Sequence, residues 1–522
     1  MTLPRGRSAG VLVPLFSLRH EEGWGVGEFP DVGAVAPWLA EARLPVLMML
    51  PLLEAAIGQN SPYSALSAFA LDPVYVRLDD LPDFHDLGGE AALSPEERRE
   101  LEAVRASPRV DYPTVRRLKN AWLHRSFRRF RESGAAAGGE RAADLQRFRE
   151  EQAHWLPDYA LFRALKEAHH LDWWKGWGEG LRDRVPEALE RARREHADAI
   201  AFFEYVQWIA FRQLAGARAE ARRHGVALAG DLPFMVAEDS ADVWARQDEF
   251  DLSATVGVPP DAFSDDGQDW GLPVYRWDVL RARDYDWLRQ RGARSAELYD
   301  LVRIDHVVGF YRTYARPRDG SPHYFVPADE AAQRRQGEEV MQAFRAAGVD
   351  LCAEDLGTVP PFVRESLTAI GVPGYRVLRW EKDGDAFRDP DHWPALSLAT
   401  TGTHDTEPVA VWWDELSEAE RRAARAIPAL HHLTDEQAAH FTPEAHRAIL
   451  EAVYRSGSDL LVLPIQDVFG LRDRINLPGT VGPENWSWRM PWSIAALGVD
   501  PFVRERTREM AALAARFGRV AG

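Results

Sequence analysis

Eight short apolar runs of strand length recur along this 522-residue chain, and they constrain its fold more than any other feature. The runs are continuously apolar, without the alternation of a half-exposed strand, which is typical of parallel strands covered on both faces. Helix-like sequence lies between them, so we expect repeated βα units, and eight such units make a (β/α)8 barrel. The chain is therefore predicted to be an α/β protein of the TIM-barrel class. The runs are residues 10–18, 44–52, 225–234, 298–307, 349–357, 375–381, 395–405 and 459–470.

The spacing of the runs is uneven and predicts inserted segments. About 170 residues separate the second run from the third, and more than 60 separate the third from the fourth. We expect residues 1–522 to form one barrel domain with mostly helical insertions after strands two and three, over residues 75–195 and 236–297. The second insertion would include a loop that covers the cleft. Residues 198–225 form a long amphipathic segment that Gly225 would close, and we expect an outer barrel helix there.

Composition and charge exclude several classes of protein. The only cysteine, Cys352, rules out an intrachain disulfide and a cysteine-based zinc site, and it is typical of a cytoplasmic protein. A net charge of −18 argues against a nucleic-acid partner. The longest apolar segment, residues 44–57, is broken by Pro51 and is shorter than the roughly 20 residues that span a bilayer, so no membrane segment is expected. The glycine-rich stretch at 23–33 lacks the spacing of a dinucleotide site, and no metal or organic cofactor is expected. The oligomeric state is left open.

Polar residues gather where five of the apolar runs end. The active sites of such barrels are built at the carboxyl ends of the strands. One buried carboxylate at a strand end is as often structural as functional, but five converging ends argue for a site. The residues at these ends are Asp231, Arg303, Asp305, His306, Glu354, Asp355, His404, Asp405, Gln466 and Asp467.

Alternation along a strand predicts different surroundings for two of these carboxyls. Arg303 and Asp305 are two residues apart and share a side, so the guanidinium would keep Asp305 ionised. His306 would face away as a support residue. Glu354 has no basic neighbour within two residues and shares its side of the strand with Cys352. An apolar setting raises the pKa of a carboxyl group and suits a general acid.

Two carboxyls tuned in opposite directions are what retaining glycoside chemistry requires. One carboxylate attacks the anomeric carbon, and the other carboxyl protonates the leaving oxygen and then deprotonates the acceptor. The transition state resembles an oxocarbenium ion, which a further carboxylate stabilises. Asp405, beside His404, is placed for that role.

The motifs RIDH (303–306), AEDLG (353–357) and THD (403–405), in this order, resemble those of the α-amylase clan of retaining glycosidases. Longer motifs narrow the resemblance to the amylomaltases, which are bacterial 4-α-glucanotransferases, and it extends from about residue 10 to 490. These motifs are GQNSPYSALSAFALDP (58–73), GDLPFMVAEDSADVWA (230–245), GVPPDAFSDDGQDWGLPVYRWD (257–278) and LPGTVGPENWSWR (477–489).

The resemblance implies a role for each matched residue. Asp305 would be the nucleophile, Glu354 the general acid/base and Asp405 the transition-state stabiliser. α-1,4-Glucans and maltooligosaccharides would be both donor and acceptor, with no cofactor. Trp486 would help to close the rim of the cleft. The implied substrate-binding residues are Arg303, His404, Asp231, Tyr63, Ser61, Asp261, Phe263, Gln268, Trp270 and Asn485.

The sequence departs from the family pattern at a few positions. Ala262 replaces a usual aromatic residue, Leu272 a common asparagine, and Val307 and Val308 an aromatic residue and an arginine. We expect these changes to affect the acceptor sites more than the reaction centre. Two alternatives to a transferase therefore stay open: an α-1,4-glucan hydrolase with a weak acceptor site, and a glucan-binding protein without activity.

Overall fold

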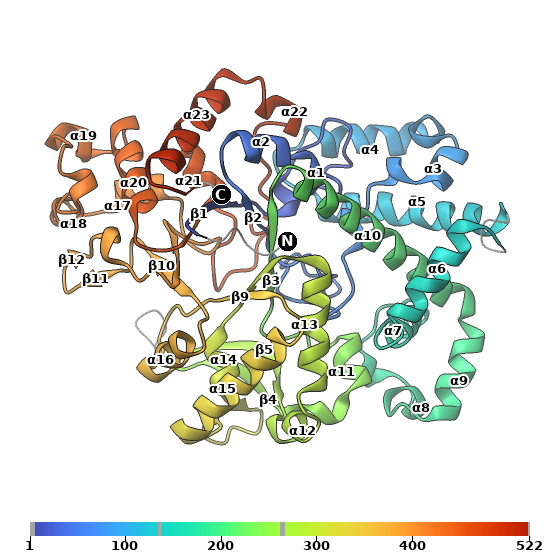
Figure 1. Ribbon diagram of the computed structural model, residues 1–522. Coiled ribbons are helices and arrows are strands. Elements are labelled where there is room, and N and C mark those ends of the chain that lie inside the picture. Colours follow the sequence, from blue (N-terminus) through green and yellow to red (C-terminus); the bar gives the residue numbers. More distant parts are fainter. Residues whose placement is uncertain (1–5, 134–137, 261–266, 520–522) are drawn as a thin grey trace.

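The structure is a computed structural model that describes residues 6–133, 138–260 and 267–519. Within these residues, eight parallel strands close into a barrel near the centre of the molecule, in the order β1-β14-β13-β10-β9-β6-β3-β2 (Figure 1). Each strand overlaps one of the apolar runs, so the predicted (β/α)8 barrel is confirmed. The strands are β1 (Ser8–Leu12), β2 (Val46–Met48), β3 (Ala227–Leu232), β6 (Leu301–Ile304), β9 (Asp350–Ala353), β10 (Gly374–Val377), β13 (Ser397–Thr400) and β14 (Leu460–Pro464).

The register of three neighbouring strands brings residues of the candidate site next to one another. Asp231 of β3 pairs with Arg303 of β6, and Arg303 pairs with Cys352 of β9. Gly230 precedes Asp231, and a Cβ atom at this position would lie 2.3 Å from the ring of Tyr299. Only glycine therefore lets Tyr299 pack against β3 and keeps Asp231 in this register.

Helices cover the outside of the barrel. Helix α10 packs against β3 and also against α1 and α7, so it lies between the barrel and the first group of inserted helices. It matches the predicted outer helix, and Gly225 follows it with φ +72°. The covering helices include α1 (Asp31–Ala34), α2 (Ala36–Glu41), α10 (Ala197–Arg223), α13 (Asp286–Leu298), α15 (Glu330–Arg345), α16 (Pro361–Ala369), α20 (Pro443–Arg455) and α23 (Pro501–Arg516).

The segment between β2 and α10 is helical in its described part and extends from the barrel on the right of Figure 1. Ser94 caps the N-terminus of helix α4, and its side chain and that of Glu97 form a capping box. The helices are α3 (Pro82–Asp86), α4 (Pro95–Ala106), α5 (Tyr112–Glu132), α6 (Glu140–Glu151), α7 (Leu156–Ala168), α8 (Glu179–Arg182) and α9 (Pro186–Glu195). The division of the chain into subdomains at 75–195 and 236–297 stays a prediction.

The segment after β3 contains strands that the sequence analysis did not expect. In addition to α11 (Ala241–Ala245) and α12 (Trp277–Ala282), it holds β4 (Phe250–Val258) and β5 (Gln268–Tyr275). These strands join β7 (Thr313–Pro317) and β8 (Tyr324–Val326) in a four-stranded antiparallel sheet of order β5-β4-β7-β8. Continuous apolar runs mark only strands buried on both faces, and the first half of β5 is mostly exposed, so this sheet gave no such signal.

The βα alternation is interrupted once around the barrel. Between β10 and β13, a hairpin of β11 (Lys382–Asp383) and β12 (Ala386–Phe387) stands where a helix was expected. Helices return between β13 and β14 as α17 (Val409–Glu415), α18 (Glu418–Ala424), α19 (Asp435–Ala439) and α20.

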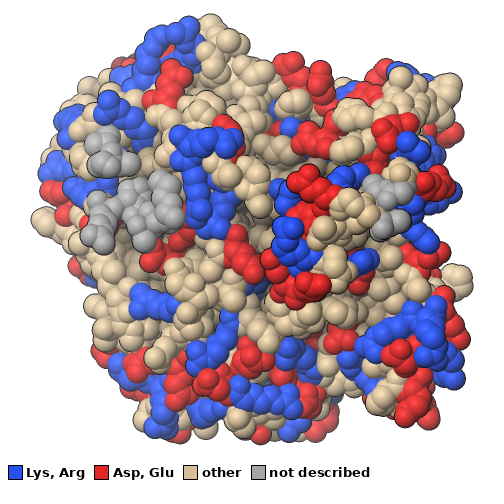
Figure 2. Space-filling view, turned by 45° about the vertical axis from the view of Figure 1, so that its right-hand side comes forward, with Lys and Arg blue, Asp and Glu red and all other residues tan. Residues whose placement is uncertain are grey.

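The surface carries charges of both signs, interspersed over the face in Figure 2. Among the described residues, no helix has the length and hydropathy needed to cross a membrane.

Candidate active site

A pocket in the mouth of the barrel is lined by side chains from several strand ends, including Arg303, Tyr375 and His404. The carboxylates predicted at β3 and β6 meet here around one guanidinium. Nη1 of Arg303 donates to both oxygens of Asp231, at 2.8 and 2.7 Å, and to Oδ1 of Asp305 at 2.9 Å. The predicted contact between Arg303 and Asp305 is therefore present.

Arg303 is a buried cation, because its side chain is only 6% exposed. Burial by itself lowers the pKa of a guanidinium, but Asp231, Tyr63 and Asp305 raise the pKa of Arg303 well above its usual value. The guanidinium is thus permanently charged, and it neutralises two carboxylates that would otherwise repel each other.

Asp231 holds Arg303 and Tyr63 in place. Its side chain is 1% exposed, and its Oδ2 also accepts a 2.7 Å hydrogen bond from the hydroxyl of Tyr63. Burial, the largest influence, raises the pKa of Asp231, while the Arg303 charge lowers it. Ser61, predicted to bind substrate, accepts a hydrogen bond from the backbone N–H of Tyr63 at 3.3 Å. Asp231 and Ser61 therefore orient Arg303 and Tyr63.

Glu354 follows β9 and lies in a different environment. Its Oε2 is 4.0 Å from Nη2 of Arg303, which is too long for a hydrogen bond. Two backbone N–H groups donate to the carboxyl group, from His306 to Oε2 at 2.8 Å and from Leu356 to Oε1 at 3.1 Å. Burial raises the pKa of Glu354 to about 8, because the lowering influence of Arg303 is partly offset by the negative charge of Asp305. This agrees with the raised pKa expected from the sequence.

Asp405 lies beyond the end of β13. Its Oδ1 accepts a 2.6 Å hydrogen bond from Asn476, and its Oδ2 is 3.3 Å from Nε2 of His404. Burial raises the pKa of this carboxyl group, but His404, Asn476 and Arg303 together lower it to about 2. Asp405 is therefore ionised at neutral pH.

Three aromatic side chains form one wall of the site. The ring of Tyr63 stacks on His404 with centroids 5.2 Å apart, and Trp486 lies 5.7 Å from each of them. Trp486 holds an unusual left-handed backbone conformation, with φ +60°. Trp486 is thus part of this wall, and its predicted role in closing the rim of the cleft stays a prediction.

His306 and Trp270 form a second wall. The His306 ring lies against Trp270 and Phe234, at centroid distances of 4.7 and 5.6 Å. Burial lowers the pKa of His306 to about 4, so the ring is neutral at pH 7. Trp270 donates to the side chain of Gln268 at 3.1 Å, and both residues come from β5.

Other predicted site residues are placed differently. The amide of Asn485 accepts from the backbone of Leu477 and donates to the carbonyl of Thr480, each at 3.0 Å. It is thus engaged in shaping its own loop, and a direct contact with a sugar stays a prediction. Asp261 and Phe263 lie outside the described residues, as does Ala262.

Two of the described positions that depart from the family pattern are buried. Val307 and Val308 are 0% and 9% exposed in α14 (Val307–Tyr311), whereas Leu272 is only partly buried. Val307 has no exposed surface for contact with a sugar, and the effect of these positions on the acceptor sites stays a prediction.

Two of the strand-end carboxylates serve the scaffold instead. Asp355 accepts from Arg364 and from the backbone of Tyr375, and Asp467 accepts from Thr401 and from the backbone of Val409. Among the described residues, no group of three or more His, Cys, Asp or Glu side chains is arranged to hold a metal ion.

Sequence reasoning missed several groups that complete the site. The backbone N–H of His306 binds Glu354, and Asn476 and Arg474 bind Asp405. A backbone N–H has no signature in the sequence. The segment LRDRINLPG after β14 contains polar residues, but no periodicity relates it to Asp405.

Comparisons with known proteins agree with this geometry. A family model described as 4-alpha-glucanotransferase matches residues 13–495. The chain is 34% identical to the 4-alpha-glucanotransferase of Thermus thermophilus, over 94% of this chain and 95% of that protein. It is 31% identical to the 4-alpha-glucanotransferase of Chlamydia pneumoniae, over 94% and 92% of the two chains.

A solved structure is similar over the whole length. The amylomaltase of Streptococcus agalactiae, solved in complex with acarbose, superposes with a TM-score of 0.84 at 25% identity, and the match covers 98% of this chain and 100% of that chain. From the extent of the family match and the identity to full-length relatives, the chain belongs to the 4-alpha-glucanotransferase family.

Proposed function

We propose that this protein transfers α-1,4-glucan segments between maltooligosaccharides by a retaining double displacement. The observation that carries the proposal is the contrast between two neighbouring carboxyls in the barrel mouth. Asp305 accepts a hydrogen bond from a permanently charged guanidinium, whereas burial raises the pKa of Glu354 to about 8. Asp305 is suited to attack the anomeric carbon, and Glu354 is suited to donate a proton.

In the first step, a carboxylate oxygen of Asp305 forms a bond to the anomeric carbon of the donor. The bond from that carbon to the leaving glucan oxygen breaks, and the oxygen takes the proton of Glu354. In the second step, the 4-hydroxyl of an acceptor attacks the anomeric carbon and gives its proton to Glu354, and the bond to Asp305 breaks. Configuration is retained because both displacements invert it.

The electrostatic coupling between the two carboxyls supports this alternation. The negative charge of Asp305 is one of the influences that raise the pKa of Glu354. In the covalent intermediate Asp305 is an uncharged ester, so this influence disappears and the pKa of Glu354 falls. Glu354 is thereby an acid in the first step and a base in the second.

Asp405 stabilises the oxocarbenium-like transition state. Its pKa of about 2 keeps it anionic, and its side chain is 43% exposed, so a bound sugar can reach it. Tyr63, Trp486 and Trp270 provide apolar faces of the kind on which sugar rings pack. A sugar stacked there, together with the acceptor, would keep water away from the intermediate.

One experiment distinguishes a transferase from the two alternatives, a hydrolase and a glucan-binding protein. The purified protein is incubated with maltotriose alone, and products are resolved by size over time. Longer maltooligosaccharides with released glucose indicate transfer, whereas glucose and maltose without longer products indicate hydrolysis. Asp305→Asn should lower the rate at least about 10⁴-fold, as expected for loss of a nucleophile. Full activity in this variant would contradict the mechanism, and no turnover of any glucan by the unaltered protein would favour a binding protein.

The proposed mechanism also predicts a distance that a crystal structure can measure. Retention requires the Asp305 and Glu354 carboxyl groups to lie about 5–5.5 Å apart, whereas a gap near about 9 Å is typical of inverting enzymes. A cytoplasmic place of action, suggested by the single cysteine, stays a prediction.

A further inference from the structure

The segment that follows β14 contacts Asp405 at two points, although about 70 residues separate them in sequence. Asn476 donates to the carboxylate at 2.6 Å, and Nη2 of Arg474 donates to the backbone carbonyl of Asp405 at 2.7 Å. The first contact holds the carboxylate itself, and the second holds the backbone from which it extends.

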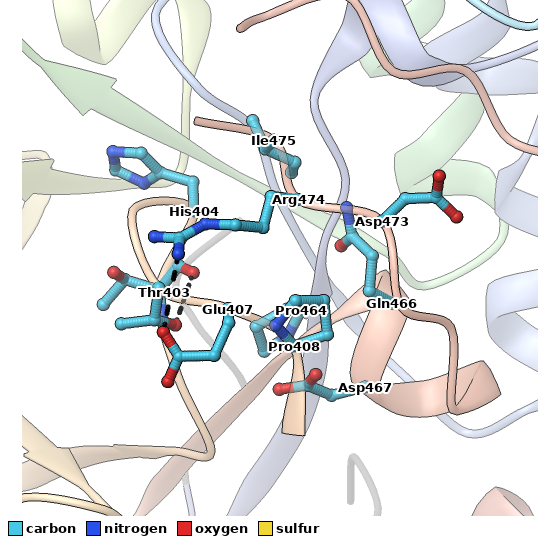
Figure 3. A pocket seen from close by; sticks show the side chains of 11 residues that line it. Thr403, His404, Glu407, Pro408, Pro464, Gln466, Asp467, Asp473, Arg474 and Ile475 are labelled. Carbon is cyan, nitrogen blue, oxygen red and sulfur yellow. Dashed lines mark hydrogen bonds and ion pairs between the residues drawn. The ribbon is translucent and has the colours of Figure 1, made fainter. Parts of the chain in front are cut away.

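Arg474 joins these two contacts into one unit. Its Nε donates to the backbone carbonyl of Asn476 at 3.2 Å, and its Nη1 lies 3.6 Å from Glu407. Figure 3 shows the Arg474 side chain extended across the pocket toward Thr403 and Glu407, with His404 beside it. A single guanidinium thus ties the carbonyl of Asp405, the backbone of Asn476 and the carboxylate of Glu407 together.

Glu407 is in turn anchored to the barrel. Arg379, which is 4% exposed, forms an ion pair with the Glu407 carboxylate and donates to its backbone carbonyl at 3.0 Å. Arg379 also donates to the carbonyl of Thr401 at 3.2 Å, and the Thr401 hydroxyl donates to the buried Asp467 at 2.5 Å. The contacts therefore run without a break from Asp405 to residues that follow β10, β13 and β14.

The same segment is linked to the aromatic wall of the site. The backbone N–H of Trp486 donates to the carbonyl of Ile475 at 2.8 Å, and the Trp486 ring lies beside Tyr63 and His404. The backbone that carries Arg474 and Asn476 is thus also bonded to the backbone that carries an aromatic wall residue.

We propose that Arg474 is a positioning residue for Asp405. It holds the Asp405 backbone and Asn476 in one fixed arrangement, so that the carboxylate stays within reach of the positive charge that develops on the sugar ring. Placement within a fraction of an ångström matters, because electrostatic stabilisation depends on groups that are already oriented before the reaction. This inference rests on the proposed role of Asp405.

The test compares two arginines of one segment. Arg474→Ala removes the guanidinium that binds Asp405, and Arg472→Ala is the matched control, because Arg472 is 56% exposed and pairs with Asp414 instead. With maltotriose, Arg474→Ala should lower kcat about 100-fold and leave KM within about threefold, the pattern of a lost transition-state contact. Arg472→Ala should keep both constants within about twofold.

Inhibition by acarbose provides a readout that a merely structural role would not move. Its unsaturated ring and amine imitate the flattened, positively charged transition state, so its Ki should rise by about the same factor as kcat/KM falls. Millimolar guanidinium should restore part of the activity of Arg474→Ala, since the side chain is 32% exposed and the site is open to a small solute. Arg474→Lys, which keeps the charge but not the branched contacts, should retain an intermediate rate.

Several results would overturn the proposal. One is a loss in Arg474→Ala no larger than in Arg472→Ala, and another is a large loss with an unchanged ratio of acarbose Ki to KM. If Arg474→Ala does not fold, full activity of Arg474→Lys would also reject it. Asp405→Asn tests the proposed role of Asp405 separately from that of Arg474. If Asp405→Asn stays active, the role proposed for Asp405 is wrong. If it is inactive while Arg474→Ala is normal, only the positioning role fails.

Discussion

The two halves of the barrel mouth hold their carboxyls in different ways. In the strand half, which comprises Asp231, Arg303, Asp305 and Glu354, the central contact joins residues 72 positions apart on paired strands. In the loop half, which comprises His404, Asp405, Arg474 and Asn476, the corresponding contact joins residues 71 positions apart, and both partners lie outside the barrel strands. The separation in sequence is therefore nearly the same, but the backbone that carries the residues differs. Strand register makes the first contact, and the seating of a loop makes the second.

The two halves also differ in the pKa of their carboxyl groups. Burial raises the pKa of both Glu354 and Asp405, yet one carboxyl titrates at about 8 and the other at about 2. Glu354 receives two backbone N–H groups and lies 4.0 Å from Arg303, with the Asp305 charge nearby. Asp405 has the His404 ring and the Asn476 amide in direct contact. The Glu354 side chain is 13% exposed and that of Asp405 is 43% exposed, so the partners of the two carboxyls and their depth of burial together account for the difference in pKa.

After loss of the nucleophile Asp305, the largest effect is expected from another residue of the strand half, in the variant Glu354→Gln. Transfer from maltotriose should fall about 10³-fold, because the leaving glucan oxygen loses its proton donor. With α-glucosyl fluoride the initial burst of fluoride should fall far less, since fluoride leaves with little help from an acid. Burst kinetics with the two donors measure the difference. Equal losses would mean that the acid comes from elsewhere, including the loop half.

Arg303→Gln should be the next largest change. It should lower kcat/KM about 10²-fold and destabilise the protein by about 3–5 kcal/mol, because it leaves Asp231 and Asp305 together without their shared cation. Asn476→Ala is the counterpart in the loop half and should cost only about 1 kcal/mol of stability, since water can reach the partly exposed Asp405. Urea unfolding and steady-state kinetics on both variants make the comparison. Similar losses of stability would show that the two halves do not differ as proposed.

The smallest effect is a shift in the pH profile. As the proposed general acid, Glu354 would have to be protonated, so kcat/KM should be sustained below pH 8 and fall about tenfold per unit as the pH rises beyond it. His404 is the main influence that lowers the pKa of Asp405, so His404→Gln should move the acidic limb to higher pH. The basic limb should stay near pH 8, because it belongs to the other half. Movement of both limbs would mean that the halves titrate as one unit.

Much of the strand half was predictable. Continuous apolar runs mark strands buried on both faces, and a parallel barrel brings their carboxyl ends to one rim. The spacing of Arg303 and Asp305 predicted their contact, and the lack of a basic neighbour predicted a raised pKa for Glu354. The two backbone N–H donors to Glu354 could not be predicted, because every residue except proline carries the same group.

The loop half was predictable only in its residue types. THD placed His404 and Asp405 at the end of a strand, but no pattern related Asn476 or Arg474 to them. The antiparallel sheet that carries Gln268 and Trp270 was also missed, because half-exposed strands are not continuously apolar. Two carboxylates expected at the rim, Asp355 and Asp467, support the scaffold through backbone hydrogen bonds that only their folded neighbours provide.

The barrel, the order of the polar residues at its strand ends and the contact between Arg303 and Asp305 follow from periodic, local features of the chain. These features act over a few residues, where backbone geometry alone relates one side chain to the next. The partners of Asp405, the wall of Tyr63, His404 and Trp486, and the final protonation of each carboxyl depend on contacts between segments far apart in sequence. Such contacts arise from packing and charge in three dimensions. They form only when the barrel is closed and the segment that carries Arg474 and Asn476 packs against it.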